Sequence, residues 1–142
     1  MSTPADAADH LSQLMLEFYE KMASWEHSVV KQTGLSPAQM HTIEMIGHHQ
    51  NLRMKELASR MGITTGTLTV MIDRLEKGGL VARQPHARDR RSFNIVLTDK
   101  GRRHFEAHHN LHLELTREIT APLTDEEMRH LETGLVKIME RF

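Results

Sequence analysis

The sequence predicts a mostly helical chain with a small β-wing, that is, a winged helix-turn-helix with long helices at both ends. Three observations lead to this fold class. Two short helical patterns, 55–61 and 64–77, lie on either side of a glycine. Two strand patterns with a basic loop between them follow at once. Longer stretches with apolar residues at three- and four-residue spacing flank this region on both sides.

The N-terminal stretch predicts one long helix that ends at Gly34, after a small polar segment at 1–8. So long an amphipathic helix would protrude from a small domain unless a partner covers it, so we expect a dimerisation helix. The alternative is a long core helix of a monomer. The apolar stripe consists of Leu11, Leu14, Met15, Phe18, Met22, Trp25 and Val29.

A second helix begins at Ser36, which has Pro37 at the first helical position and Gln39 to close a capping box. It directs Met40, Ile43 and Ile46 inward and stops near 47–50.

The next two helices form the helix-turn-helix. Gly62 reaches the left-handed conformation that ends the first, and Thr64 caps the second. The second helix has an apolar stripe at Leu68, Met71, Ile72 and Leu75. A helix in the major groove reads bases mainly from its N-terminal residues, and threonine can donate, accept and touch a thymine methyl group. The predicted DNA-binding residues of this helix are Thr64, Thr65, Thr67, Thr69 and Arg74.

A β-hairpin follows, with strands predicted at 80–84 and 92–97. Its loop holds Arg88, Arg90 and Arg91, which suit a narrow minor groove where the negative potential is strongest. We expect a salt bridge between Asp89 and Arg91 that reduces the ordering cost of binding.

The charge distribution agrees with a nucleic-acid interface. The net charge is −1, but residues 53–103 hold 12 Lys and Arg against 5 Asp and Glu, which is +7 and leaves −8 for the rest. A basic segment within an otherwise acidic chain is expected when only that segment contacts the phosphates of a nucleic acid.

After the hairpin, Thr98 caps a helix predicted from Asp99 to about Thr120. A last helix begins at a capping box formed by Thr124 and Glu127. Its apolar residues are Met128, Leu131, Leu135, Ile138 and Phe142.

Four motifs in this order resemble the MarR family of bacterial transcriptional regulators. They are Leu57-Ala58, Leu75-Glu76-Lys77-Gly78-Gly79-Leu80-Val81, Asp89-Arg90-Arg91 and Leu97-Thr98-Asp99-Lys100-Gly101. The resemblance implies a homodimer that binds a pseudo-palindromic operator in double-stranded DNA, most often as a repressor, and is controlled by a small-molecule or metal effector. Where family members often have a basic or polar residue, this chain has Val70.

We therefore expect one domain over residues 1–142. Residues 36–101 would form the DNA-binding module, and 8–33 and 102–142 the dimerisation helices. The chain has room for one real core, because a domain of this size buries roughly two thirds of its unfolded surface. It has no cysteine, which excludes disulfides and thiolate sites. It has no apolar run long enough for a membrane span and no signal peptide, so we expect a cytoplasmic protein.

Eleven histidines are a high number for this length, and three of them, His104, His108 and His112, recur at four-residue spacing. Two imidazoles at that spacing can reach one metal ion. The alternative is a solvated histidine face.

The resemblance extends to a zinc-responsive branch of the family. It implies zinc bound by His41, His108, His112 and a carboxylate, for which Glu26 is the best candidate. Zinc would then fix the two recognition helices near the ~34 Å separation of successive major grooves. That branch also has an accessory site with a cysteine, which this chain lacks. The residues that remain open in place of Glu26 are His27, Glu20 and Glu17.

A competing hypothesis keeps the fold and replaces zinc with an aromatic or phenolic ligand that releases the protein from DNA. Phe18, Met22, Trp25 and Met45 would line its pocket, although a methionine stripe is more often core. We expect no enzyme, because nothing in the sequence indicates a positioned general base.

Overall fold

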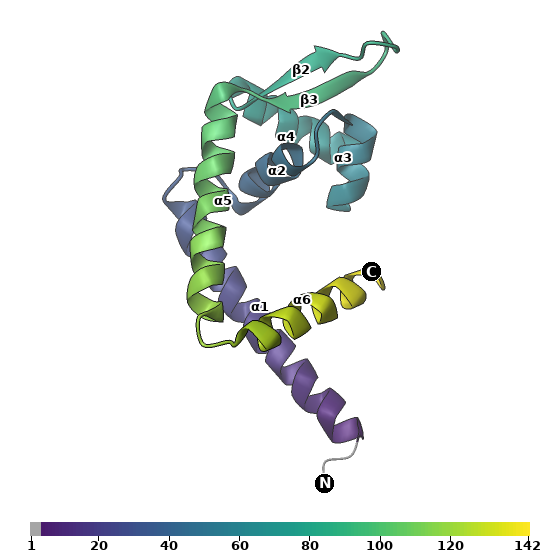
Figure 1. Cartoon of the computed structure of the whole chain (residues 1–142). Coiled ribbons are helices and arrows are strands. Elements are labelled where there is room, and N and C mark those ends of the chain that lie inside the picture. Colours follow the sequence, from purple (N-terminus) through teal and green to yellow (C-terminus); the bar gives the residue numbers. More distant parts are fainter. Residues whose placement is uncertain (1–3) are drawn as a thin grey trace. The chain divides into compact units, whose positions relative to one another are not determined.

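The computed structural model describes residues 4–142 and contains two compact units, Met1–Arg102 and Arg103–Phe142. Figure 1 labels the elements. They are α1 (Pro4–Lys31), α2 (Pro37–His48), β1 (Leu52–Arg53), α3 (Met54–Met61), α4 (Thr65–Lys77), β2 (Val81–Pro85), β3 (Phe93–Leu97), α5 (Asp99–Thr120) and α6 (Asp125–Met139). The helix α5 begins in the first unit and continues in the second.

The capping groups confirm the predicted start of α2 and the predicted end of α3. The Ser36 hydroxyl oxygen accepts a hydrogen bond from the Gln39 backbone N–H at 3.1 Å, and Gln39 Oε1 accepts one from the Ser36 N–H at 2.9 Å. Gly62 ends α3 with φ +66°, a left-handed conformation that glycine adopts without a Cβ clash. The long N-terminal helix begins at Pro4, within the small polar segment at 1–8 that was expected to precede it.

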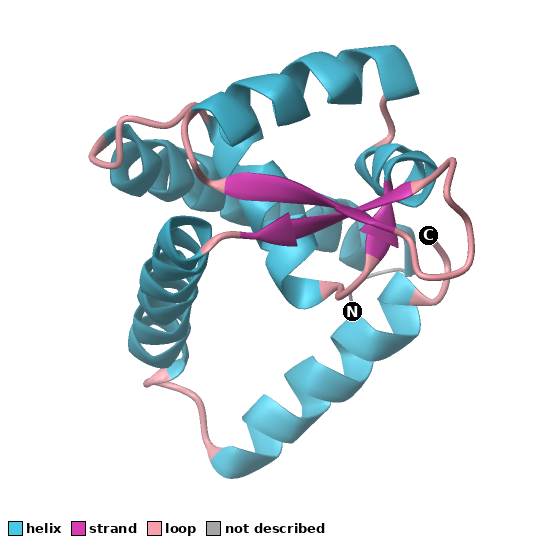
Figure 2. Cartoon of the chain, turned by 90° about the horizontal axis from the view of Figure 1, so that it is seen from above, coloured by secondary structure: helices cyan, strands magenta, loops and turns pink. Residues whose placement is uncertain are grey.

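Three antiparallel strands form the sheet in the order β1–β3–β2, and Figure 2 shows the β2–β3 pair as a twisted ribbon. The hairpin is confirmed, with Val81 opposite Leu97 and Pro85 opposite Phe93. The strand β1 was not predicted. It contains two residues, too few for an alternating pattern, and exists because Leu52 pairs with Ile95 across the sheet.

The core of the first unit is formed by α2, α3, α4 and β3. The apolar stripe predicted for α4 is confirmed, since three of its four residues are fully buried and Met71 is half-buried. Fully buried side chains from the four elements are Met40, Ile43, Leu57, Leu68, Ile72, Leu75 and Ile95. This core supports α4 from one side and leaves its opposite edge exposed.

The motif after the hairpin fastens the chain to the turn that follows α4. The Thr98 hydroxyl donates to the Gly79 carbonyl at 2.6 Å, and Lys100 Nζ donates to the Gly78 carbonyl at 3.0 Å. A Cβ on Gly101 would collide with the Leu80 carbonyl oxygen, so only glycine fits there. The Leu-Thr-x-x-Gly pattern is thus a packing device at the base of the hairpin.

The second unit consists of the larger part of α5 together with α6. The bounds of α5 agree with the predicted 99–120, and Thr124 caps α6 in a capping box with Glu127. Over residues 4–142, no helix combines the length and the apolar character that crossing a membrane requires.

Candidate nucleic-acid interface

The N-terminal edge of α4 presents the predicted threonines to solvent. Thr65, Thr67 and Thr69 are all exposed. Thr64 caps the helix as predicted, because its hydroxyl oxygen accepts from the Thr67 backbone N–H at 3.1 Å. The same hydroxyl donates its proton to the Thr67 hydroxyl oxygen at 3.0 Å. The cap therefore fixes the first turn of the exposed edge.

The hydroxyl of Thr69 donates to the Thr65 carbonyl oxygen at 2.7 Å. Its proton is thus used within the helix, and its free lone pair and methyl group are what it can offer outward. Val70 beside it is 52% exposed. Such a surface suits the amino groups of adenine and cytosine and the methyl group of thymine.

Arg83 on β2 joins α4 to the hairpin, and no pattern in the sequence predicts this contact. Its Nη2 lies 2.6 Å from Asp73 Oδ1, and its Nη1 lies 2.7 Å from Glu76 Oε1. The hydrogen bond to Asp73 raises the pKa of Arg83 further above its usual value, with both carboxylates adding to the effect. The three-residue spacing of Asp73 and Glu76 marks a common face of α4, but their partner depends on where β2 packs. Arg74 lies between these two carboxylates in the sequence. It is a predicted DNA-binding residue, and its side chain is exposed.

The wing loop between β2 and β3 holds the three predicted arginines, Arg88, Arg90 and Arg91, all exposed. Its ends are closed by a hydrogen bond from the His86 N–H to the Ser92 carbonyl oxygen at 3.0 Å.

The predicted salt bridge between Asp89 and Arg91 takes another form. Asp89 Oδ1 accepts a hydrogen bond from the Arg91 backbone N–H at 3.0 Å. Among residues 4–142 the two side chains form no ion pair. An aspartate reaches the backbone two residues on without ordering a long guanidinium side chain, which explains the preference. The carboxylate therefore shapes the loop, and the Arg91 guanidinium extends into solvent.

Arg53 and His86 were also not predicted as part of this interface. The Arg53 guanidinium Nη2 lies 2.8 Å from His86 Nε2, which connects β1 to the wing loop. The two residues are 33 positions apart, so no sequence periodicity relates them.

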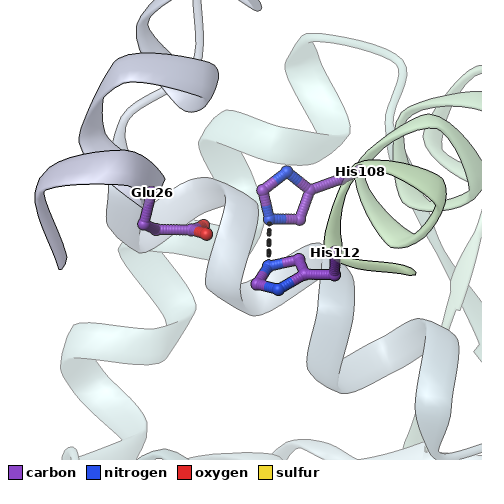
Figure 3. A group of neighbouring side chains, drawn as sticks. All are labelled: Glu26, His108 and His112. Carbon is purple, nitrogen blue, oxygen red and sulfur yellow. Dashed lines mark hydrogen bonds between the residues drawn. The ribbon is translucent and has the colours of Figure 1, made fainter. Parts of the chain in front are cut away.

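Two of the predicted metal ligands lie together on α5. The Nε2 atoms of His108 and His112 are 3.1 Å apart, and Figure 3 draws this pair with Glu26. Their rings meet edge to face, with centroids 4.7 Å apart. His108 is 2% exposed and His112 is half-buried. Two imidazole nitrogens thus converge from one helix face.

The other predicted ligands belong to the first unit. Glu26 on α1 is half-buried, whereas His41 on α2 is exposed. Burial raises the pKa of Glu44 on α2 to about 7, and the nearby charge of Glu26 adds to this shift. Burial and repulsion from Glu26 thus favour the neutral form of Glu44. His104, the third member of the predicted row, is half-buried.

Comparisons with known proteins agree with this geometry. A family model described as the MarR family matches residues 35–93. The HTH-type transcriptional repressor MdtR of Bacillus subtilis is 34% identical over 95 residues, which cover 66% of this chain and 61% of that protein. The match therefore spans less than two thirds of this relative. MdtR is named as a transcriptional repressor, in agreement with the expected class of DNA-binding regulator.

Two solved structures share the fold. A MarR family protein from Bacillus stearothermophilus has a TM-score of 0.87 at 23% identity, with 99% of this chain and 98% of the other covered. FabT of Streptococcus pneumoniae, solved in complex with DNA, has a TM-score of 0.85 at 23% identity, with 94% and 95% covered. At this identity the likeness concerns the fold, and it confirms the predicted fold class.

Proposed function

The chain belongs to the MarR family, and from this premise we propose that it is a transcriptional repressor that binds operator DNA as a homodimer. The observation on which the proposal mainly rests is the anchored, exposed edge of α4. Its threonines face solvent, and Arg83 ties the same helix to the arginine-rich wing. One unit thus contains a helix that suits the major groove and a loop that suits the minor groove.

In this proposal α4 enters the major groove with its N-terminal end. Thr65 and Thr69 contact base edges, and Val70 packs against a thymine methyl group. The arginines of the wing loop enter the adjacent minor groove, where they exploit its potential and read its width. Arg74 is assigned to a phosphate. Base contacts specify the site, and phosphate contacts set the register of the protein on the duplex.

Exposed apolar surface supports the homodimer. Large apolar side chains in the N-terminal half of α1 and along α6 are exposed, far more than scattered surface residues account for. A second copy of the chain would cover them, and a dimer with two-fold symmetry matches a pseudo-palindromic operator. The side chains are Leu11, Leu14, Met15, Leu16, Phe18 and Tyr19 on α1, and Met128, Leu131, Leu135, Val136, Ile138 and Met139 on α6.

The experiment is a fluorescence-anisotropy titration with operator candidates from the upstream region of the protein's own gene. Wild type should bind one of these duplexes tightly and unrelated DNA weakly. Arg91→Ala should lose most of that affinity. Arg117→Ala, which removes the same charge from an exposed position of α5, serves as the control and should bind like wild type. Equal affinity of wild type for all duplexes would contradict a sequence-specific repressor.

We further propose zinc as the effector, bound by His108 and His112 with Glu26 and His41 as the other ligands. The donor set suits zinc, since imidazole nitrogens and a carboxylate are its usual oxygen and nitrogen ligands. Support comes from the two Nε2 atoms that converge on α5 and from the half-buried carboxyl group of Glu26 in the first unit. When bound, zinc supplies a structural link.

Zinc can change DNA affinity only by its differential affinity for the free and DNA-bound states. The test is the same titration with zinc or a chelator for wild type and for His108→Ala/His112→Ala. The matched control is His104→Ala/His109→Ala, which alters the same helix. A zinc-dependent gain in affinity that only the first double variant loses would support the proposal. Affinity that ignores zinc would refute it and favour an aromatic or phenolic effector.

A further inference from the structure

Arg53 and His86 present two hydrogen-bond donors to each other. His86 Nδ1 lies 3.2 Å from the backbone N–H of Arg88 and 3.2 Å from that of Asp89. Both backbone groups can only donate, so Nδ1 accepts and the ring proton sits on Nε2. The guanidinium of Arg53 also can only donate, and its Nη2 lies 2.8 Å from that same Nε2.

No protonation state of the imidazole satisfies both sides of the ring. If the ring proton were on Nδ1, that N–H would face two backbone N–H groups, and no acceptor would lie between them. A doubly protonated ring would oppose donors on both sides and add a positive charge beside Arg53. The backbone contacts thus leave an imidazole N–H and a guanidinium N–H converging on one point. Convergent donors of this kind suit an oxyanion, which accepts from both at once.

An open cleft of about 430 Å³ has Arg53 of this pair in its lining. Arg53, Lys55 and Arg91 line it, together with the exposed Thr65 hydroxyl at the start of α4. Among residues 4–142, no carboxylate forms an ion pair with these three cationic side chains.

Glu56 is the one acidic residue of the lining, and its Oε2 is engaged by the Arg53 backbone N–H at 3.2 Å. The cleft is thus positively charged and faces both the start of α4 and the wing.

We propose that Arg53 and His86, with Lys55 beside Arg53, form a phosphate-binding site. The inference rests on the proposed function and deepens it, because the site lies between α4 and the wing, where a duplex engaged by both would pass a backbone phosphate. That phosphate would accept from Arg53 Nη2 and His86 Nε2 and so tie β1 to the wing loop. A free phosphate ion has the same chemistry, and the experiment separates the two sources.

Two variants test the donors. Arg53→Ala removes the cationic donor. His86→Asn keeps an acceptor near the position of Nδ1, and thus the loop, but removes the Nε2 donor. Arg117→Ala is the control for the loss of one charge. Affinity for the operator and for unrelated DNA is measured as a function of salt, because each neutralised phosphate contributes about 0.9 to the slope of log K against log salt.

Arg53→Ala should weaken binding to both duplexes by about tenfold, the size expected for a charged hydrogen bond. It should also lower the salt slope by about one. His86→Asn should weaken both several-fold with an unchanged slope, since a neutral donor releases no counterion. An equal loss on both duplexes is required, because a phosphate contact carries no sequence information.

The second arm follows the NMR signals of the His86 ring while inorganic phosphate is added without DNA. A saturable shift that Arg53→Ala abolishes would show that the site also takes the free ion. Variants that bind both duplexes like Arg117→Ala, together with unmoved ring signals, would overturn the inference. Wild type that binds no operator would instead overturn the proposed function, so the two failures are distinguishable.

Discussion

Arg83 on β2 lies 2.6 Å from Asp73 on α4, measured from Nη2 to Oδ1, and a second hydrogen bond reaches Glu76. The strand that leads into the wing is thereby joined to the helix that would read the major groove. The two parts of the interface must keep a fixed separation if both are to enter neighbouring grooves.

Arg83→Ala should therefore weaken operator binding while the protein stays folded. The pair is partly exposed, so the loss in free energy of unfolding should be only about 1 kcal/mol. Urea denaturation and anisotropy titration measure the two effects. Arg83→Lys keeps the charge but cannot bind both carboxylates in the same way. Its DNA affinity should lie between those of wild type and Arg83→Ala. Unchanged DNA affinity in both variants would show that the contact does not position α4.

Gly101→Ala should destabilise the protein although it replaces glycine in a helix. The added Cβ would collide with the Leu80 carbonyl oxygen, so the backbone must shift. Overpacking of this kind costs about 1–3 kcal/mol, which exceeds the gain of about 0.5–1 kcal/mol in helix propensity. Gly134→Ala on α6 meets no atom within 4 Å and should stabilise instead. Thermal unfolding, monitored by circular dichroism, shows whether each variant is more or less stable than wild type. Two variants that shift the same way would contradict the packing argument.

Glu44 should make stability depend on pH. Burial raises its folded-state pKa to about 7, from 4.5 for an unburied carboxyl group, and Glu26 contributes. The unfolded chain loses this proton more readily, so its contribution is fully present below pH 4.5 and is lost as the pH rises to about 7. The group is half-exposed, so solvent screening reduces the effect to about 1 kcal/mol.

Chemical denaturation from pH 4.5 to 7 in the presence of a chelator measures this slope. Glu44→Gln should flatten it, and Glu132→Gln, an exposed carboxyl group on α6, should leave it unchanged. Identical profiles for wild type and Glu44→Gln would rule out the titration of Glu44 as its source.

Asp89→Asn should preserve the wing loop, and Asp89→Ala should loosen it. An asparagine oxygen can still accept the Arg91 backbone N–H, whereas a salt bridge would be lost in both variants. Hydrogen exchange of the Arg91 amide reports on this bond without interference from the altered charge. Equal loss of protection in both variants would favour the side-chain ion pair.

Local signals in the sequence were enough for most of the fold. Ser36 and Gln39 form a capping box within four residues, and Gly62 needs only its own backbone to end α3. The stripe of α4 repeats at helical spacing and is buried accordingly. Each of these features depends on neighbours in the chain, which explains why a single sequence suffices to predict them.

The interface was harder to predict from the sequence because its contacts join distant segments. Arg53 meets His86, and Arg83 meets Asp73, only once the sheet has formed in its observed register. The threonines and wing arginines were predicted from composition and position, but the contacts of Arg83 and Arg53 were not. His108 and His112 share one helix face and could be paired from spacing, whereas Glu26 could be assigned only by resemblance.

We expect two copies of this chain to read two half-sites of one operator. Hydroxyl-radical footprinting of the upstream duplex, with protein-to-DNA stoichiometry measured in parallel, tests it most directly. We predict two protomers per duplex, two protected half-sites whose centres lie about one helical turn, roughly 34 Å, apart, and minor-groove protection flanking them. The flanking protection should vanish in Arg91→Ala. A single unpaired protected site, or protection unrelated to sequence, would contradict the account.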